Sequence, residues 1–191
     1  MTWERTVARE LTVAAATRLT ADVRRLVLTT TDGAALPSFT PGSHIAVECG
    51  DGRRNAYSLT GPGVEPDHYA ISVRLAADGR GGSRWLHEIA VGQPVSVSAP
   101  RSDFPPVLTA RHHVFVAGGI GITPVLSHVR AAVAWGRSFE VHYVGRPGTV
   151  AHLDDLLALC DDRLAVYAHR GELWAVLGPA LRDRPLGTHL Y

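Results

Sequence analysis

Three short segments of the sequence combine residue types that suit the binding of flat aromatic rings and phosphates. The first is Asn55-Ala56-Tyr57-Ser58-Leu59, preceded by Arg53-Arg54. A tyrosine on a strand can lie flat against a planar aromatic ligand, and the hydroxyl of the serine that follows can hydrogen-bond the edge of that ligand. The segment is equally compatible with a plain β-strand whose tyrosine lies in the core, so alone it does not establish a site.

The second segment is Gly79-Arg80-Gly81-Gly82-Ser83, directly before an expected helix. Glycines let the backbone curl so that amide N–H groups point inward, and the start of a helix favours an anion. We expect Ser83 to cap the helix and to offer its hydroxyl to a phosphate, with Arg80 or Arg84 adding charge. A simple turn before a capped helix is the alternative.

The third segment is Gly118-Gly119-Ile120-Gly121-Ile122-Thr123-Pro124, between an expected strand and an expected helix. An α/β unit holds a dinucleotide pyrophosphate at this position. The segment departs from the G-x-G-x-x-G pattern, because Pro124 occupies the last glycine position. No acidic residue ends the following strand, where Gly145-Arg146 stands instead, so a general dinucleotide-binding fold does not follow from this loop alone.

The elements that must position these segments fall into two classes. The first hundred residues contain short runs rich in Val, Thr and Ile, separated by Gly, Pro and Asp turns. We expect strands at residues 6–15, 23–30, 44–49, 56–60, 69–75 and 94–99, and a short helix at 83–90. Six strands joined by tight turns predict a small antiparallel β-barrel.

The rhythm changes after Phe104-Pro105-Pro106. Strands are expected at residues 113–117, 139–144, 164–168 and 188–191, and helices at 125–135, 153–159 and 173–181. Alternating β and α elements predict a parallel sheet covered by helices. The predicted fold is therefore a two-domain β plus α/β protein, with a six-stranded antiparallel barrel at 1–107, a parallel α/β domain at 108–191, and a linker near 101–110.

Composition excludes several classes of protein. The net charge of +1 gives no electrostatic case for binding nucleic acid or acidic membranes, and no stretch approaches the roughly 18 apolar residues of a membrane span. The two cysteines, Cys49 and Cys160, form no disulfide framework, and the start lacks an apolar signal core, so we expect a cytoplasmic protein. The ten histidines show no metal-ligand spacing, and Asp154-Asp155 and Asp161-Asp162 are expected to be solvated helix ends.

The order and spacing of the segments resemble the ferredoxin–NADP reductase superfamily, and most of all its phthalate dioxygenase reductase and vanillate demethylase reductase branch. The resemblance covers nearly the whole chain. Phe39-Thr40-Pro41-Gly42-Ser43-His44 is similar to the F-x-P-G-x-H turn of that branch, and Pro100-Arg101-Ser102-Asp103-Phe104-Pro105 to its P-R-x-x-F-P linker. The three segments above match its flavin strand, its FMN-phosphate loop and its nicotinamide-nucleotide loop.

The resemblance implies particular roles for these residues. Tyr57 would stack on the flavin, Ser58 would hydrogen-bond near its reactive nitrogen, and Thr123 would lie between flavin and nicotinamide; these three are the candidate catalytic residues. The expected flavin contacts are Arg54, Asn55, Ala56, Tyr57, Ser58, Leu59, Ser72, Val73, Arg74, Arg80, Gly81, Gly82, Ser83 and Thr123. The expected nicotinamide-nucleotide contacts are Gly118, Gly119, Gly121, Ile122, Thr123, Pro124 and Arg146. No metal site is expected.

The implied cofactors are FMN and NADH, with NADPH possible, because Arg146 has no second basic neighbour for a 2′-phosphate. The implied function is a reductase component that passes electrons from NADH through FMN to an iron–sulfur centre serving a terminal oxygenase. We expect an iron–sulfur domain or ferredoxin as partner, and a monomer. An FMN-binding electron-transfer subunit with little NADH turnover is the alternative.

Two departures from the branch matter. Its flavin motif is R-x-Y-S, and Asn55 stands here at the Arg position, while Arg54 is expected to point to the other face of the strand. The branch also continues past the last strand into a C-G-P loop and a [2Fe–2S] domain. The chain stops at Tyr191, so we expect a nicotinamide half that is incomplete at its C-terminus.

Overall fold

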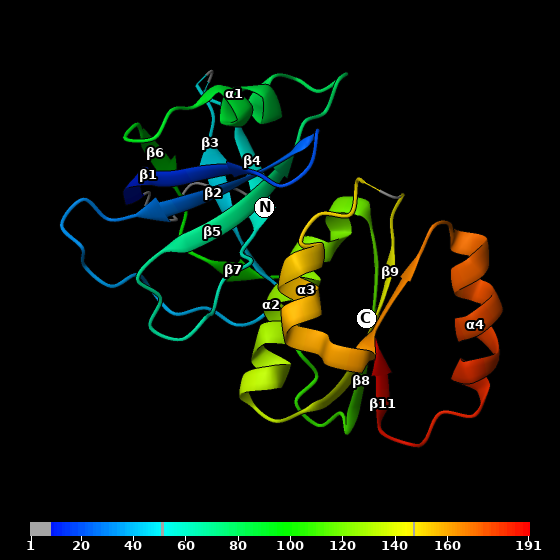
Figure 1. Cartoon of the computed structure of the whole chain (residues 1–191). Coiled ribbons are helices and arrows are strands. Elements are labelled where there is room, and N and C mark those ends of the chain that lie inside the picture. The colour runs from blue at the N-terminus through cyan, green and yellow to red at the C-terminus, as the bar shows by residue number, and fades with distance from the viewer. Residues whose placement is uncertain (1–8, 51, 147) are drawn as a thin grey trace.

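The fold is that of a computed structural model, which describes residues 9–50, 52–146 and 148–191. Two domains lie side by side, an antiparallel barrel formed by the first half of the chain and a parallel sheet with helices formed by the second (Figure 1). The start of the strand expected at 6–15 lies partly outside the described residues.

The barrel consists of β1 (Arg9–Arg18), β2 (Val23–Thr29), β3 (Ser43–Glu48), β4 (Arg54–Ser58), β5 (Tyr69–Arg74) and β6 (Pro94–Val97). The strands are hydrogen-bonded in the order β4-β3-β6-β1-β2-β5, and the two-residue strand β7 (Arg101–Ser102) adds to β3. An isolated bridge between Leu59 and Ile71 joins the two ends of this order, just beyond β4 and within β5. The predicted six-stranded antiparallel barrel is confirmed, with β7 as an addition inside the expected linker.

Alternating side chains fill the barrel because successive residues of a strand point to opposite faces. In β5, Tyr69, Ile71 and Val73 join the core, while Ser72 and Arg74 point outward. Helix α1 (Gly82–Glu88) closes one end and buries Leu86 in the same core (Figure 1).

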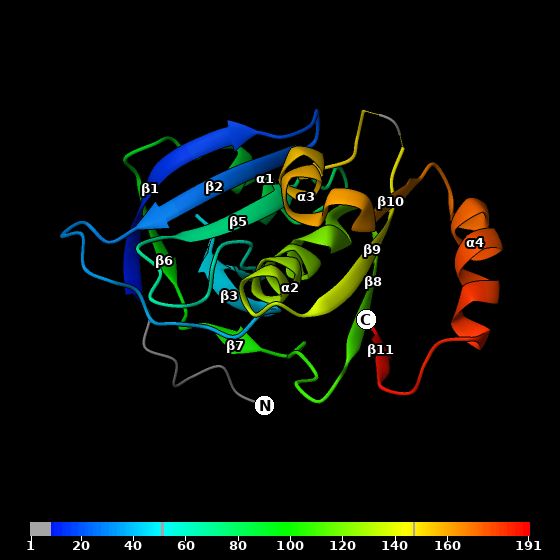
Figure 2. The same ribbon diagram turned by 60° about the horizontal axis from the view of Figure 1, so that its bottom comes forward.

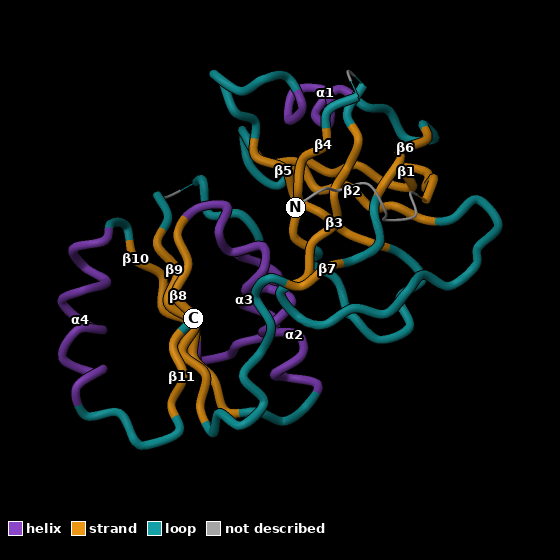
Figure 3. Tube along the Cα trace, turned by 180° about the vertical axis from the view of Figure 1, so that it is seen from behind, coloured by secondary structure: helices purple, strands orange, loops and turns teal. Residues whose placement is uncertain are grey.

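The second domain has four parallel strands, β8 (His112–Gly118), β9 (Ser138–Val144), β10 (Leu164–Tyr167) and β11 (Thr188–Leu190), in the order β10-β9-β8-β11. Helices α2 (Ile122–Ala134) and α3 (Leu153–Cys160) cover the face that looks toward the barrel, and α4 (Arg170–Arg182) covers the other (Figures 2 and 3). Two single-turn 3-10 helices, Gly119–Gly121 and Asp161–Arg163, precede α2 and follow α3. The predicted parallel α/β arrangement is confirmed.

The helix boundaries differ from the expectation, and α2 begins three residues early, at Ile122. Helix α1 begins at Gly82, with Gly81 at the N-cap position, so Ser83 is not its cap. The Ser83 hydroxyl instead accepts a hydrogen bond from the Ala76 N–H at 3.1 Å. Helix α4 begins at Arg170 rather than at residue 173, because the His169 side chain accepts a hydrogen bond from the Glu172 N–H and caps it.

The turn before β3 and the linker hold the domains together around His128 of α2. The backbone N–H of Gly42 donates to the Ser127 hydroxyl at 2.9 Å, and His128 Nε2 lies 2.9 Å from the Phe104 carbonyl. Gly42 has a φ of 78°, and a Cβ there would lie 2.0 Å from the Phe104 oxygen, so only glycine fits. His128 also packs against the rings of Phe104 and Tyr191.

Burial lowers the pKa of His128 to about 4, although the hydrogen bond to the Phe104 carbonyl acts in the opposite direction. A histidine that is neutral in the fold and protonated in the unfolded chain stabilises the fold fully only above its unfolded pKa of about 6.5. We therefore expect the free energy of unfolding to fall by about 2 kcal/mol between pH 7 and pH 5 through this residue alone.

Urea unfolding of the wild type and of His128→Leu at both pH values measures this contribution. The variant is expected to show a smaller loss of stability between pH 7 and pH 5, because it has no proton to take up. Equal losses in the two proteins would contradict the burial of a neutral His128.

Candidate functional site

The segment expected to hold an aromatic ring borders a gap in the barrel. The sheet order ends with β4 at one edge and β5 at the other, and the Leu59–Ile71 bridge is where these edges meet. Because the bridge is antiparallel, residues 55–58 run alongside residues 72–74 on the side that leads to α1. The backbones of the segments expected to contact a flavin from β4 and β5 therefore lie along the two edges of one gap, although the side chains of Leu59 and Val73 belong to the barrel core.

Two side chains of β4 line the gap from its first edge. Asn55 and Tyr57 pair with Val47 and Ile45 of β3 and share one face of the strand. Asn55 Nδ2 lies 3.4 Å from the Tyr57 hydroxyl oxygen, and both side chains are half-buried. Burial raises the pKa of Tyr57, and its ring packs partly against the barrel core.

Arg54 points away from the gap, as strand alternation predicts. Its guanidinium pairs with Glu48 at 2.8 Å on the outer face of the sheet, where both side chains are more than a third exposed. Asn55 is therefore the polar residue of this strand that faces the loop before α1. Arg54 remains an expected flavin contact only through its backbone.

The glycine segment before α1 closes the gap at its far end. Gly81 has a φ of 100°, which only glycine adopts readily. A Cβ at Gly82 would lie 2.1 Å from Asn55 Nδ2, so this glycine lets the loop approach the Asn55 amide. Arg24 of β2 fixes the other end of the helix, because its guanidinium donates to the carbonyls of Leu86 and Ile89 at 3.1 and 2.9 Å. Arg80 is exposed beside this loop.

The third segment approaches the same gap from the second domain. A Cβ on Gly119 would come within 3.9 Å of Arg74 Nη1, at the end of β5. Thr123 is buried, and its hydroxyl donates to the Ile120 carbonyl at 3.0 Å, so that it braces the turn. The buried Tyr143 hydroxyl donates to the Gly119 carbonyl at 3.0 Å from beneath, and burial raises the pKa of Tyr143 to about 12. Ile122 and Pro124 lie in the first turn of α2.

Gly118 and Gly121 are not required by the chain's own conformation. Their φ values are −131° and −61°, which any residue adopts, and a Cβ on either would meet no atom within 4 Å. Open space therefore lies directly against the backbone at both positions. These positions could therefore admit the close approach of a ligand to the backbone.

A groove of about 1020 Å³ runs beside α3 at the carboxyl ends of β9 and β10. In parallel α/β sheets ligands bind at this edge. Its charged lining residues are Asp154, Asp155 and Glu172, together with His152. Arg146 is exposed just after β9 and is not among the residues that line the groove.

Sequence reasoning missed a buried polar contact beside this groove. The sequence predicts Asp155 as a solvated helix end and assigns His152 no role, yet His152 is buried and hydrogen-bonded to both Ser72 and Asp155. Ser72 was expected to face the flavin, and the structure places its hydroxyl against His152 of the second domain. No sequence pattern signals a pairing of residues 80 positions apart.

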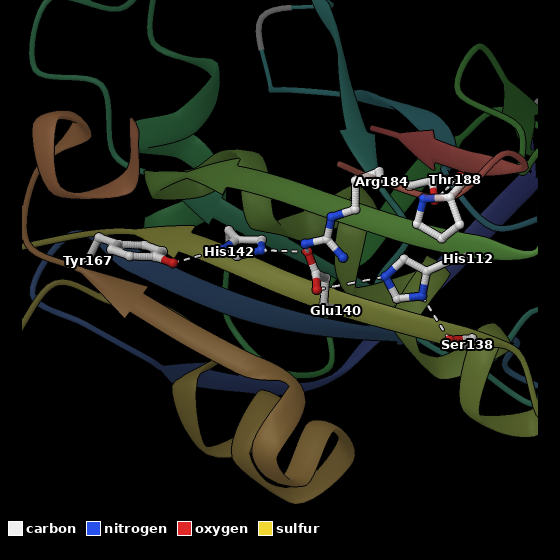
Figure 4. A network of polar contacts seen from close by, with 8 residues as sticks. His112, Ser138, Glu140, His142, Tyr167, Arg184 and Thr188 are labelled. Atoms are coloured by element: carbon white, nitrogen blue, oxygen red, sulfur yellow. Dashed lines mark hydrogen bonds and ion pairs between the residues drawn. The ribbon is translucent and has the colours of Figure 1, made fainter. Parts of the chain in front are cut away.

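Histidines also gather on the opposite face of the sheet, beside α4 (Figure 4). Glu140 Oε1 lies 2.9 Å from His142 Nε2 and also accepts a hydrogen bond from Arg184, while His112 Nε2 is 3.7 Å from Glu140 Oε2. Burial would raise the pKa of Glu140, but His142 and Arg184 outweigh it and hold this pKa below its usual value. The cluster is a network of polar contacts around Glu140, with Arg184 as its ion-pair partner, and it lies away from the gap.

Within residues 9–50, 52–146 and 148–191, no group of His, Cys, Asp and Glu side chains has the arrangement of a metal site. Over the same residues, no helix is both long and apolar enough to cross a membrane.

Comparison with known proteins supports a reductase relationship. Residues 98–191 match the family model of the dimethylamine monooxygenase subunit DmmA-like N-terminal domain. The carnitine monooxygenase reductase subunit of Escherichia coli K12 is 39% identical over 189 residues, which are 95% of this chain and 59% of that protein. The phthalate dioxygenase reductase of Burkholderia cepacia is 39% identical over 149 residues, or 76% of this chain and 46% of that protein.

Solved structures agree. The structure of phthalate dioxygenase reductase superposes with a TM-score of 0.87 at 32% identity, over 96% of this chain and 59% of that chain. Full-length CYP116B46 from Tepidiphilus thermophilus gives a TM-score of 0.89 at 36% identity, over 97% of this chain and 25% of that chain. The chain thus spans less than two thirds of the length of these relatives. It is a homologue of phthalate dioxygenase reductase and related oxygenase reductase subunits, and it has the two-domain fold of the ferredoxin reductases.

Proposed function

We propose that the chain is the flavin- and nicotinamide-binding part of an oxygenase reductase. It would take electrons from NADH through FMN to an iron–sulfur centre, either a further domain or a ferredoxin, that serves a terminal oxygenase. The observation that carries the proposal is the proximity of the three segments: Gly82 meets Asn55 of β4, and Gly119 meets Arg74 of β5, beside the edges joined by the Leu59–Ile71 bridge.

The gap fits the chemistry of a flavin mononucleotide. A half-buried aromatic ring, Tyr57, stands on one edge, and Arg74 stands on the other. The glycine loop before α1 leaves backbone N–H groups of Gly81 to Ser83 for a phosphate, with Arg80 and Arg84 exposed nearby. The similarity of this loop to the FMN branch favours FMN over FAD.

A bound flavin would supply the acceptance of a hydride and the release of single electrons. The chain's residues would supply position. Tyr57 would hold the ring plane, and the Ser58 hydroxyl would orient the ring edge. The turn at residues 120–123, held by the hydrogen bond from Thr123 to the Ile120 carbonyl, would leave room for the nicotinamide ring beside the flavin. Hydride transfer needs two aligned rings in contact, so proximity rather than proton transfer is the main contribution expected from the protein.

The nucleotide groove favours NADH over NADPH. Among the described residues that line the groove beside α3 are Asp154, Asp155 and Glu172, and none of them is an arginine. A 2′-phosphate would bring a second negative group beside these carboxylates, and like charges repel. Arg146 stays exposed outside the groove, where it can stack on an adenine or meet a phosphate at the rim.

The proposal predicts that Gly121→Ala leaves the fold and FMN binding intact and weakens NADH binding at least tenfold. The added methyl group meets no protein atom, so it would collide only with a ligand. Anaerobic stopped-flow reduction of the FMN-loaded chain, followed at increasing NADH concentration, gives the NADH dissociation constant and the limiting rate.

Gly178→Ala on α4 is the matched control, because a Cβ there also meets nothing and the site lies on the far face of the sheet. It is expected to bind NADH as the wild type does. Unchanged NADH binding by Gly121→Ala would contradict the placing of the nucleotide. A wild type that binds FMN but is reduced only by dithionite would support the FMN-binding electron-transfer subunit instead.

A second prediction concerns Asn55, the neutral residue that faces the phosphate loop. Asn55→Arg adds a positive charge beside the loop at Gly82, so FMN is expected to bind at least as tightly as in the wild type, with a gain of up to about tenfold. Quenching of FMN fluorescence on titration with apoprotein measures the affinity.

Asn55→Leu serves as the comparison, because it removes the amide without adding charge and is expected to bind FMN more weakly than the wild type. A large loss of FMN affinity in Asn55→Arg would show that Asn55 has a role other than facing the phosphate.

A further inference from the structure

A buried chain of hydrogen bonds connects the groove beside α3 with the gap between β4 and β5. His152 lies just before α3, on the wall of the groove, and its side chain is fully buried. His152 Nε2 lies 2.8 Å from Ser72 Oγ on β5, and His152 Nδ1 lies 2.7 Å from Asp155 Oδ2. One imidazole therefore contacts the second domain with one nitrogen and the barrel with the other.

The partners fix the direction of these hydrogen bonds. A carboxylate only accepts, so Nδ1 carries the proton and donates a hydrogen bond to Asp155, and Nε2 is then the acceptor for the Ser72 hydroxyl. Burial lowers the pKa of His152, with Asp155 acting in the opposite direction. The neutral imidazole is thus held in one tautomer and one orientation.

The same carboxylate extends the contact to the other edge of the gap. Asp155 Oδ1 lies 2.8 Å from Arg130 Nη2 of α2, and Arg130 Nε donates to the Thr60 carbonyl at 3.0 Å. Thr60 follows β4, and Ser72 lies in β5, on either side of the Leu59–Ile71 bridge. We call the set of Ser72, His152, Asp155 and Arg130 the clasp.

We propose that the clasp positions the nicotinamide nucleotide against the flavin. His152 is the positioning residue, because it fixes how the second domain docks on the barrel. The inference rests on the proposed function, because it assigns a role to residues beside that site. The residues themselves touch neither reacting ring in the proposal; they hold β4 and β5 on one side and the start of α3 on the other.

The backbone at His152 makes a clean test possible. Its φ of 61° lies in the left-handed region, which Asn tolerates well among residues with a side chain. In His152→Asn the short amide can still donate to Asp155, but it is too short to reach Ser72. In His152→Gln the longer amide can still accept from Ser72. The two variants therefore separate the contact across the domains from the contact within α3.

We expect His152→Asn and Ser72→Ala to lower the limiting rate of flavin reduction by NADH at least tenfold, with the FMN and NADH dissociation constants within threefold of the wild type. His152→Gln is expected to retain most of the rate. The double variant His152→Asn with Ser72→Ala should be no slower than either single variant, because both remove the same hydrogen bond. His68→Leu and Ser96→Ala, on the barrel and outside the clasp, are the controls.

Limiting rates in His152→Asn and Ser72→Ala that equal the wild-type rate would overturn the inference. Parallel losses of the limiting rate, the FMN affinity and the thermal stability in these variants would also overturn it, because they would indicate a structural role alone. A wild type that fails to bind FMN, or is not reduced by NADH, would instead count against the proposed function.

A second measurement keeps the clasp testable in that case. Hydrogen–deuterium exchange on the chain without FMN or NADH is expected to be faster in peptides covering residues 148–156 for His152→Asn and Ser72→Ala, and unchanged for His152→Gln. Unchanged exchange in the first two variants would show that the clasp does not hold the groove against the barrel, whatever the chain binds.

Discussion

The architecture depends on the covering of one barrel strand by the second domain. Ser72 lies on the outer face of β5, where an isolated barrel would leave it in water, yet it is buried and hydrogen-bonded to His152. A buried hydroxyl without a partner would be costly, so the two domains are held in the one register that satisfies it. The same docking brings Gly119 beside Arg74, so the glycine loop before α2 meets the end of β5.

Hydrogen bonds within the second domain fix the glycine loop before α2. Thr123 and Tyr143 both donate to carbonyls of the Ile120 and Gly119 turn, so the loop that would carry a pyrophosphate is held from within and from beneath. His128 of α2 contacts the Phe104 carbonyl of the linker, and Ser127 of α2 accepts a hydrogen bond from Gly42 in the turn before β3. Gly118 and Gly121 of this loop leave the backbone exposed, since a Cβ on either would meet no atom within 4 Å.

Local patterns predicted the elements well, because alternation and turn residues act over a few positions. In β4, Arg54 pairs with Glu48 and Asn55 faces Gly82. The sequence predicts these opposite orientations because side chains alternate between the two faces of a strand. Contacts between distant segments did not follow. Asp155, predicted as a solvated helix end, is bound by Arg130 and His152, and Ser83, predicted as a helix cap, accepts a hydrogen bond from the Ala76 N–H.

The central claim is that one gap, between β4 and β5 under the Gly118 loop, holds the flavin. A crystal structure of the chain grown with FMN tests it most directly. The claim predicts the flavin ring against Tyr57, with its phosphate at the Gly81–Ser83 backbone and its exposed face toward Gly118 and Thr123. Density for FMN elsewhere, for example in the groove beside α3, with the gap filled only by water, would contradict it.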